Sequence, residues 1–135
     1  MITSALVAYL KANLSNSRIF VGQAPLETVL PCITIDDGGD ERSRHWSNGV
    51  TVTGSIEQDY ECTVWATEFN ALAAKQLADE LVTLLDNFAG PMVDTSLSPN
   101  VSHAIQWIEC ENSGGDFNPA TEHYAQSVFL SIDYK

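Results

Sequence analysis

The chain has 135 residues, the length of a single domain, and its hydrophobic content of 44% is typical of a folded globular protein. It carries 18 Asp and Glu residues against 6 Lys and Arg residues, a net charge of −12. This balance argues against binding to a nucleic-acid backbone, which requires clustered basic residues. No apolar run approaches the roughly 20 residues that cross a bilayer, so we expect no membrane partner.

The first part of the chain predicts a helix and two short strands. The helix is expected over residues 3–15, because leucines recur at every fourth position from Leu6 to Leu14. The strands are expected over residues 18–21 and 31–35. The second strand starts at a proline, where the missing N–H group matters least.

A long antiparallel strand is predicted from Val50 to Val64, where apolar and polar residues alternate. An amphipathic helix follows over residues 68–88 and stops before Gly90 and Pro91. The apolar stripe that we expect to face the core consists of Phe69, Leu72, Ala73, Leu77, Leu81, Leu84, Leu85 and Phe88.

After a loop rich in Pro, Ser and Asn, two more strands are predicted over residues 102–111 and 123–134, with a loop over 112–121 between them. The order of these elements predicts one domain over residues 1–135. Its expected fold class is α+β, with a mostly antiparallel sheet of about five strands and two helices packed on one face.

The late predicted strands carry apolar residues on both faces, although two helices can cover only one face of such a sheet. Strict alternation assigns Ile105 and Trp107 to one face and Ile108 to the other, and it sets Phe129 opposite Leu130. We expect the second apolar surface to be buried against another copy of the protein, or by a sheet that folds on itself.

The stretch DDGGDERSRHW, residues 36–46, concentrates charged and aromatic side chains around a Gly-Gly pair. Its acids do not have the spacing of a calcium loop, and it offers only one histidine to a transition metal. We predict a solvated loop between two strands that can also act as an assembly contact. The residues of this candidate contact loop are Asp36, Asp37, Asp40, Glu41, Arg42, Arg44, His45 and Trp46.

No pattern elsewhere predicts catalysis, since the sequence lacks the GxSxG nucleophile elbow and the GxxxxGK[ST] phosphate-binding loop. The acids Glu109, Glu111 and Asp116 form a cluster that could bind a cation, but a solvated strand end is the simpler interpretation.

The cysteines are Cys32, Cys62 and Cys110, and they form no CxxC pair of the kind that indicates a zinc or redox site. We expect three small buried thiols in a reducing cytoplasm. Taken together, the residue patterns predict no catalytic residue, no metal site and no cofactor.

Several motifs follow one another in a distinctive order. Arg18-Ile19-Phe20, Ala24-Pro25 and Leu30-Pro31-Cys32-Ile33 come after the first predicted helix, and Tyr60-Glu61-Cys62-Thr63-Val64-Trp65-Ala66 leads directly into the second. This order resembles the tail-completion, or tail-terminator, proteins of long-tailed bacteriophages. The similarity is clearest over residues 2–35 and 56–88. Cys32 stands where that family has an aromatic residue, and residues 36–55 have no clear counterpart.

The resemblance implies a structural virion protein that forms a ring, typically of six copies, and caps the growing tail tube. Such a ring ends polymerisation of the tube and presents a surface for head–tail joining. The implied partners are further copies of the chain, the tail tube protein and the connector or neck protein. DNA would pass through the lumen without specific binding. The implied location is the tail–neck region of the virion, after assembly in the host cytoplasm.

Three other functions fit parts of the sequence. A neck or head-completion adaptor is the nearest to the terminator. An acidic protein-binding module would stay monomeric. A metal-dependent hydrolase would require His103, His123 and nearby acids to converge in the fold.

Overall fold

A computed structural model describes residues 2–16, 18–25, 28–37, 42–47, 52–119 and 123–134. For residues 42–47, 52–55, 68 and 118 it describes the backbone alone. The elements are α1 (Thr3–Asn13), β1 (Ile19–Val21), β2 (Cys32–Asp37), β3 (Arg42–Ser47), β4 (Val52–Thr67), a 3-10 turn (Glu68–Asn70), α2 (Ala71–Leu85), β5 (Gly90–Asp94), β6 (Val101–Asn118) and β7 (His123–Tyr134).

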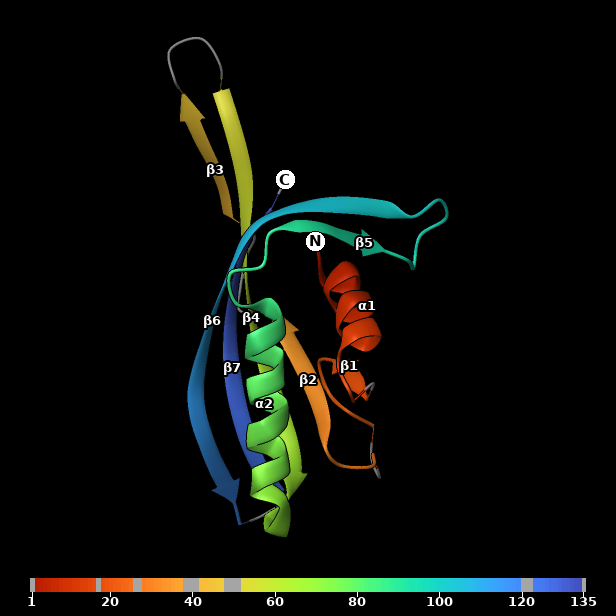
Figure 1. Ribbon diagram of the computed structural model, residues 1–135, viewed down its shortest axis with the longest axis vertical. Coiled ribbons are helices and arrows are strands. Elements are labelled where there is room, and N and C mark those ends of the chain that lie inside the picture. The colour runs from red at the N-terminus through yellow and green to blue at the C-terminus, as the bar shows by residue number, and fades with distance from the viewer. Residues whose placement is uncertain are drawn as a thin grey trace.

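The strands form one seven-stranded sheet in the order β1-β2-β4-β7-β6-β5, and β3 pairs with β4 outside this path (Figure 1). Every strand pair is antiparallel except β1 with β2. The predicted α+β class with a mostly antiparallel sheet and two helices is therefore confirmed. The sheet has more strands than expected because β3 and β5 were not predicted as strands.

One face of the sheet carries the core. Along β4, every second residue from Tyr60 to Ala66 is buried, as the predicted alternation required. On α2, Leu77, Leu81 and Leu85 are buried against this face and belong to one hydrophobic cluster with the strand residues. The helix lies over β4, β6 and β7, so its apolar stripe covers the middle of the sheet.

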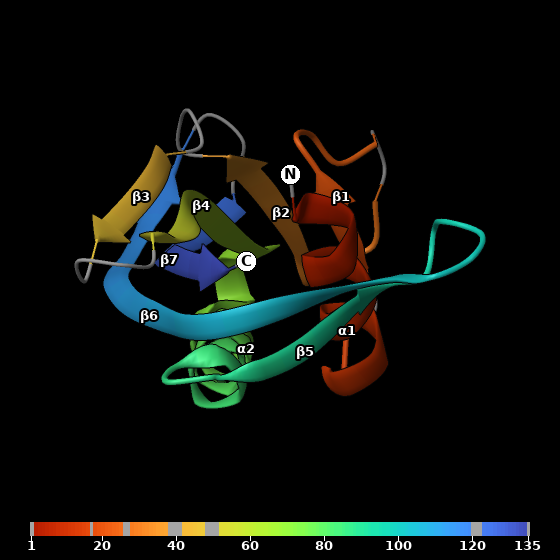
Figure 2. The same cartoon turned by 90° about the horizontal axis from the view of Figure 1, so that it is seen from above.

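The other helix, α1, lies on the same side of the sheet as α2 and packs beside β1 and β5. Figure 2 shows how β5 and the first part of β6 curl around this side of the molecule. Thr3 and Tyr60 join α1 to β4 through their hydroxyl groups, 2.9 Å apart. At the other end of α1, both the N–H and the hydroxyl of Ser15 donate to the carboxylate of Glu80 on α2, at 2.7 and 2.8 Å. The sheet thus curls around α1 on its core side, but this curl does not bury the second apolar surface, where Trp107 and Phe129 remain 46% and 43% exposed.

The assignment of Ile105 and Trp107 to one face is wrong. The pairing of β6 with β7 shifts register between these two residues, as in a β-bulge. The shift places both Ile105 and Ile108 in the core, while Trp107 is 46% exposed. An extra residue in the strand breaks the period of two on which the assignment depended.

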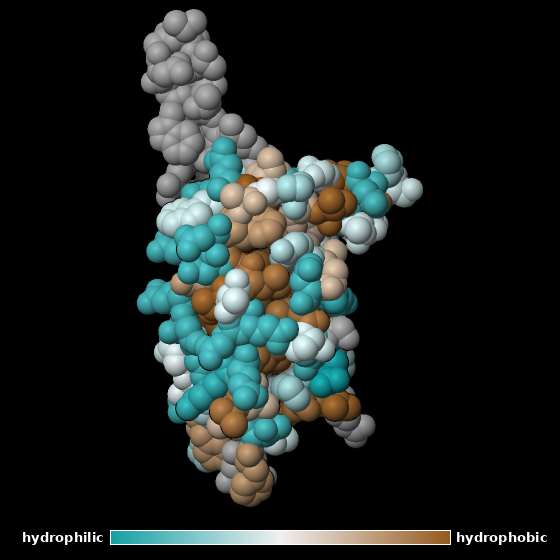
Figure 3. Space-filling model, in the orientation of Figure 1, coloured by the Kyte–Doolittle hydropathy of each residue, from teal (hydrophilic) through white to brown (hydrophobic). Residues whose placement is uncertain are grey.

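The predicted apolar stripe of the second helix is also wrong at its beginning. Phe69 is 93% exposed and Leu72 is 66% exposed, and Ala74 and Ala78 occupy the buried positions instead. The helix starts later than expected because a 3-10 turn over Glu68–Asn70 precedes it. Figure 3 shows apolar surface at the lower end of the molecule, where α2 begins.

Two segments expected as loops are strands. Gly90–Asp94 forms β5 at the edge of the sheet, where it pairs with β6. Pro91 has no N–H to donate, and an edge strand tolerates this because it pairs on one side. The predicted loop over 112–121 is wrong for most of its length, because β6 continues to Asn118. The pairing of β6 with β7 shifts register a second time between Asn112 and Gly114, and β6 continues beyond this shift. Gly114 has a φ of +87°, a conformation that glycine adopts readily.

Leu81→Ala should lower the free energy of unfolding by about 2–5 kcal/mol, because it leaves a cavity beneath a fully buried side chain. The same substitution at Leu72, which is 66% exposed on the same helix, should change it by less than about 0.5 kcal/mol. Urea unfolding of both variants measures the difference. Equal losses would contradict the packing of α2 on the sheet.

Candidate functional site

The candidate contact loop is not a loop over most of the part that the structure describes. Asp36 and Asp37 are exposed at the end of β2, and Arg42, Arg44, His45 and Trp46 belong to β3. Asp40 and Glu41 lie outside the described residues. The expectation of a solvated loop is therefore wrong for residues 42–46. Their sequence has no apolar alternation, which is why it does not predict the strand that pairs with β4.

This strand builds a two-stranded extension of the sheet. Arg42–Ser47 of β3 pairs antiparallel with residues 52–57 of β4. We call this pair the arm, and Figure 1 shows it projecting away from the helices and the rest of the sheet. At its base, Arg42 and Asp133 are the register partners of Glu57 on its two sides. Farther out, Arg44 is the register partner of Ser55.

The face of the sheet that points away from the helices, which we call the outer face, is acidic. None of the strand residues whose side chains are described is Lys or Arg, although the same strands supply many acids. At positions that alternate with the core residues, the acids with exposed or half-buried side chains are Asp36, Asp59, Glu61, Glu109, Glu111, Asp116 and Asp133.

Four of these acids surround a hollow of about 470 Å³ in the middle of the outer face. The register places Glu61 of β4 and Glu111 of β6 on either side of Phe129. It places Asp59 and Glu109 in the same way around Ser131, one step along the strands. We call Asp59, Glu61, Glu109 and Glu111 the carboxylate frame. Standard strand geometry makes it about 7 Å long and about 10 Å wide.

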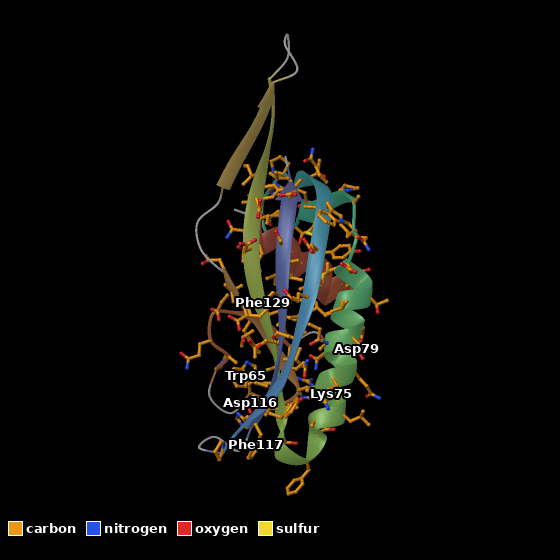
Figure 4. The ribbon with its side chains drawn as sticks, turned by 90° about the vertical axis from the view of Figure 1, so that its left-hand side faces the viewer. Trp65, Lys75, Asp79, Asp116, Phe117 and Phe129 are labelled. Atoms are coloured by element: carbon orange, nitrogen blue, oxygen red, sulfur yellow. The ribbon has the colours of Figure 1, made fainter. Side chains whose placement is uncertain are left out.

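Aromatic side chains accompany the acids. Phe129, inside the frame, is 43% exposed, and Trp107 is 46% exposed. The indole N–H of Trp107 donates to Oδ1 of Asn87 at 3.1 Å, and that of Trp65 donates to Oγ1 of Thr34 at 2.9 Å. In Figure 4, Trp65 and Phe129 lie on the sheet, whereas α2 carries Lys75 and Asp79 beside it. Aromatic side chains are enriched at protein contacts, whereas carboxylates are depleted there, so the exposed rings rather than the acids point to a contact.

The two histidines that a metal-dependent hydrolase would require lie far apart in the fold. His103 lies beside Tyr134, with the two ring centroids 5.8 Å apart, at the end of β7. His123 begins the same strand, so about 36 Å of extended chain separates the two places. Within the described residues, no group of three or more His, Cys, Asp or Glu side chains could hold a metal ion. The convergence that this alternative required is therefore contradicted.

The cysteines behave mainly as core residues. Cys32 and Cys62 are buried, as predicted, and Cys110 is half-buried; all three are free thiols. Burial, and after it the nearby Cys110, raise the pKa of the Cys62 thiol to about 12. Burial and then Asp86 raise the pKa of the Cys110 thiol to about 12 as well. None of these environments stabilises a reactive thiolate.

A variant that keeps only Cys62 should react with a thiol reagent at pH 8 about a thousandfold more slowly when folded than when unfolded in urea. The reason is that a pKa near 12 leaves far less thiolate than an ordinary value near 8.5. The raised pKa also implies that stability is full below the unfolded thiol's pKa and falls as the pH rises from there toward 12. Rapid labelling of the folded protein would contradict the burial of Cys62.

No helix among the described residues is both long and apolar enough to span a bilayer. Comparison of the sequence with models of known protein families and with curated proteins gave no match. Neither helix covers the acidic outer face, and the arm projects away from the helices (Figure 1).

Proposed function

We propose that this chain is a structural virion protein of a long-tailed bacteriophage, which forms a ring on the end of the tail tube. The observation that carries the proposal is a stably packed core combined with two uncovered surfaces, the arm and the outer face. An isolated two-stranded hairpin is marginally stable in water, so an arm of this kind is expected to pack on something. The resemblance of the sequence to tail-terminator proteins gives that partner an identity.

Ring formation is supported by the difference between the two surfaces. The arm and the outer face are unlike each other, so a contact between them on two copies is heterologous, or head to tail. Heterologous contacts generate closed rings when the rotation between neighbours divides a full circle. A ring of six copies is the number implied by the resemblance.

The charge of the chain suits a ring through which DNA moves. A net charge of −12 on each copy repels phosphate rather than holding it, so DNA can slide through the lumen without a specific contact. The two rims of such a ring would meet the tail tube protein on one side and the connector or neck protein on the other. Its place in the virion would be the junction of tail and head.

The proposal is tested with the tail tube protein of the same phage, polymerised in the presence and absence of this chain and viewed by negative-stain electron microscopy. We expect a ring at one end of each tube, and no growth when more tube protein is added to that end. Tubes that grow equally with and without the chain would contradict the terminator function. Binding to portal-bearing heads but not to tubes would favour the neck adaptor instead.

A further inference from the structure

The strand β6 leaves a long edge of the sheet without a partner strand. On one side it pairs with β7 over residues 105–118, but on the other side β5 pairs with it only over residues 101–105. Beyond residue 105, no strand among the described residues lies against this second side, which we call the free edge. Such an edge is a template to which a strand of another molecule can add by hydrogen bonding.

The segment that follows α2 closes the first part of the free edge. The backbone N–H of Asn87 donates to the carbonyl of Ile108 at 2.9 Å, and Oδ1 of Asp86 accepts the N–H of Cys110 at 3.2 Å. Oδ1 of Asn87 also accepts the indole N–H of Trp107 at 3.1 Å. The backbone groups of β6 that an added strand would meet here are therefore already bonded within the chain.

A β-bulge interrupts the middle of the free edge. The register with β7 shifts between Asn112 and Gly114, and the φ of Gly114 is +87°. The N–H of Gly114 donates to Oδ1 of Asn112 at 3.2 Å, and the hydroxyl of Ser113 donates to the carbonyl of Ser127 on β7 at 3.2 Å. A bulge of this kind twists an edge away from the regular geometry that strand addition requires.

The last part of the free edge is closed by Asp116. Its Oδ1 accepts the N–H of Phe117 at 2.8 Å. Cys110 and Phe117 face residues of β7 that are an even number of positions apart. Because the direction of the backbone N–H alternates along a strand, both N–H groups point to the side of β6 on which Asp86 lies. Asp86 and Asp116 therefore cap equivalent donors at two places on the free edge.

We infer that β6 caps its own free edge, so that no strand of another molecule, including a second copy of this chain, adds to it. Side-chain oxygens already accept the backbone N–H groups of Cys110, Gly114 and Phe117. A strand that added here would have to break these bonds before it formed its own, and the exchange would gain little free energy.

Electrostatics acts in the same direction. Glu109, Glu111 and Asp116 are exposed on β6, and like charges on neighbouring strands repel one another. The β6 edges of two copies would bring these acids close together. The capped edge does not depend on the proposed ring, but it excludes strand addition at β6 as a contact between copies and leaves the outer face for that purpose.

The double variant Asp86→Ala with Asp116→Ala removes two caps and should open the free edge. It should self-associate about tenfold more strongly than the wild type, because each uncapped N–H can then donate to a second chain. Sedimentation velocity measures the association. Hydrogen exchange with mass spectrometry locates it, and residues 110–117 should gain protection when the variant associates.

Asp86→Asn with Asp116→Asn is the matched control, because asparagine removes the same charge but keeps an Oδ1 acceptor. This pair should associate no more strongly than the wild type. Circular dichroism and thermal melting confirm that each variant folds.

Three results would overturn the inference. They are an Ala pair that associates no more strongly than the wild type, an Asn pair that associates as strongly as the Ala pair, and new association without protection of residues 110–117. None of them decides the proposed function, which the capping of tail tubes tests separately.

Discussion

The long strand β4 is the constraint on which the rest of the structure depends. Its C-terminal half pairs with β2 on one side and with β7 on the other, while its N-terminal half continues beyond the body to pair with β3. The alternation of its side chains sends Tyr60, Cys62 and Val64 into the core and the intervening residues to the opposite face. One strand therefore determines the core, the outer face and the arm together.

The two helices complete only one side of this arrangement. Each buries an apolar stripe against the core face, and at about 25 cal/mol per Å² that burial is the main source of stability. The outer face has no such cover and instead gathers acids on neighbouring strands, where like charges oppose folding slightly. The proposed assembly contact lies on this surface, which neither helix covers.

The sequence predicts the parts of the fold that follow a regular period. The alternation from Tyr60 to Val64 and the four-residue repeat of leucines in α1 and α2 give the α+β class and most of the core. The alternation of apolar and polar residues cannot reveal a bulge, so it places Trp107 on the same face as Ile105. It also cannot tell that Phe69 lies before the helix rather than on its buried stripe, because a 3-10 turn shifts the phase.

The outer face illustrates what the sequence could and could not indicate about a site. The sequence shows Glu109, Glu111 and Asp116 as a group of acids. The acids that lie across the sheet from Glu109 and Glu111, Asp59 and Glu61, are far from them in the chain. Only the register of β4 with β7 and of β7 with β6 brings the four carboxylates around Phe129. The charge of residues 36–46 marks this stretch in the sequence, but it does not predict that Arg42 and Arg44 lie at alternate positions of a strand.

The proposed assembly buries the outer face between copies of the chain. Carboxylate footprinting with a carbodiimide and an amine, followed by mass spectrometry, tests it most directly on the monomeric and the assembled protein. Glu109 and Glu111 should lose most of their labelling on assembly, whereas Asp79 on α2 should keep its labelling. Unchanged labelling of Glu109 and Glu111 in the assembled form would contradict it.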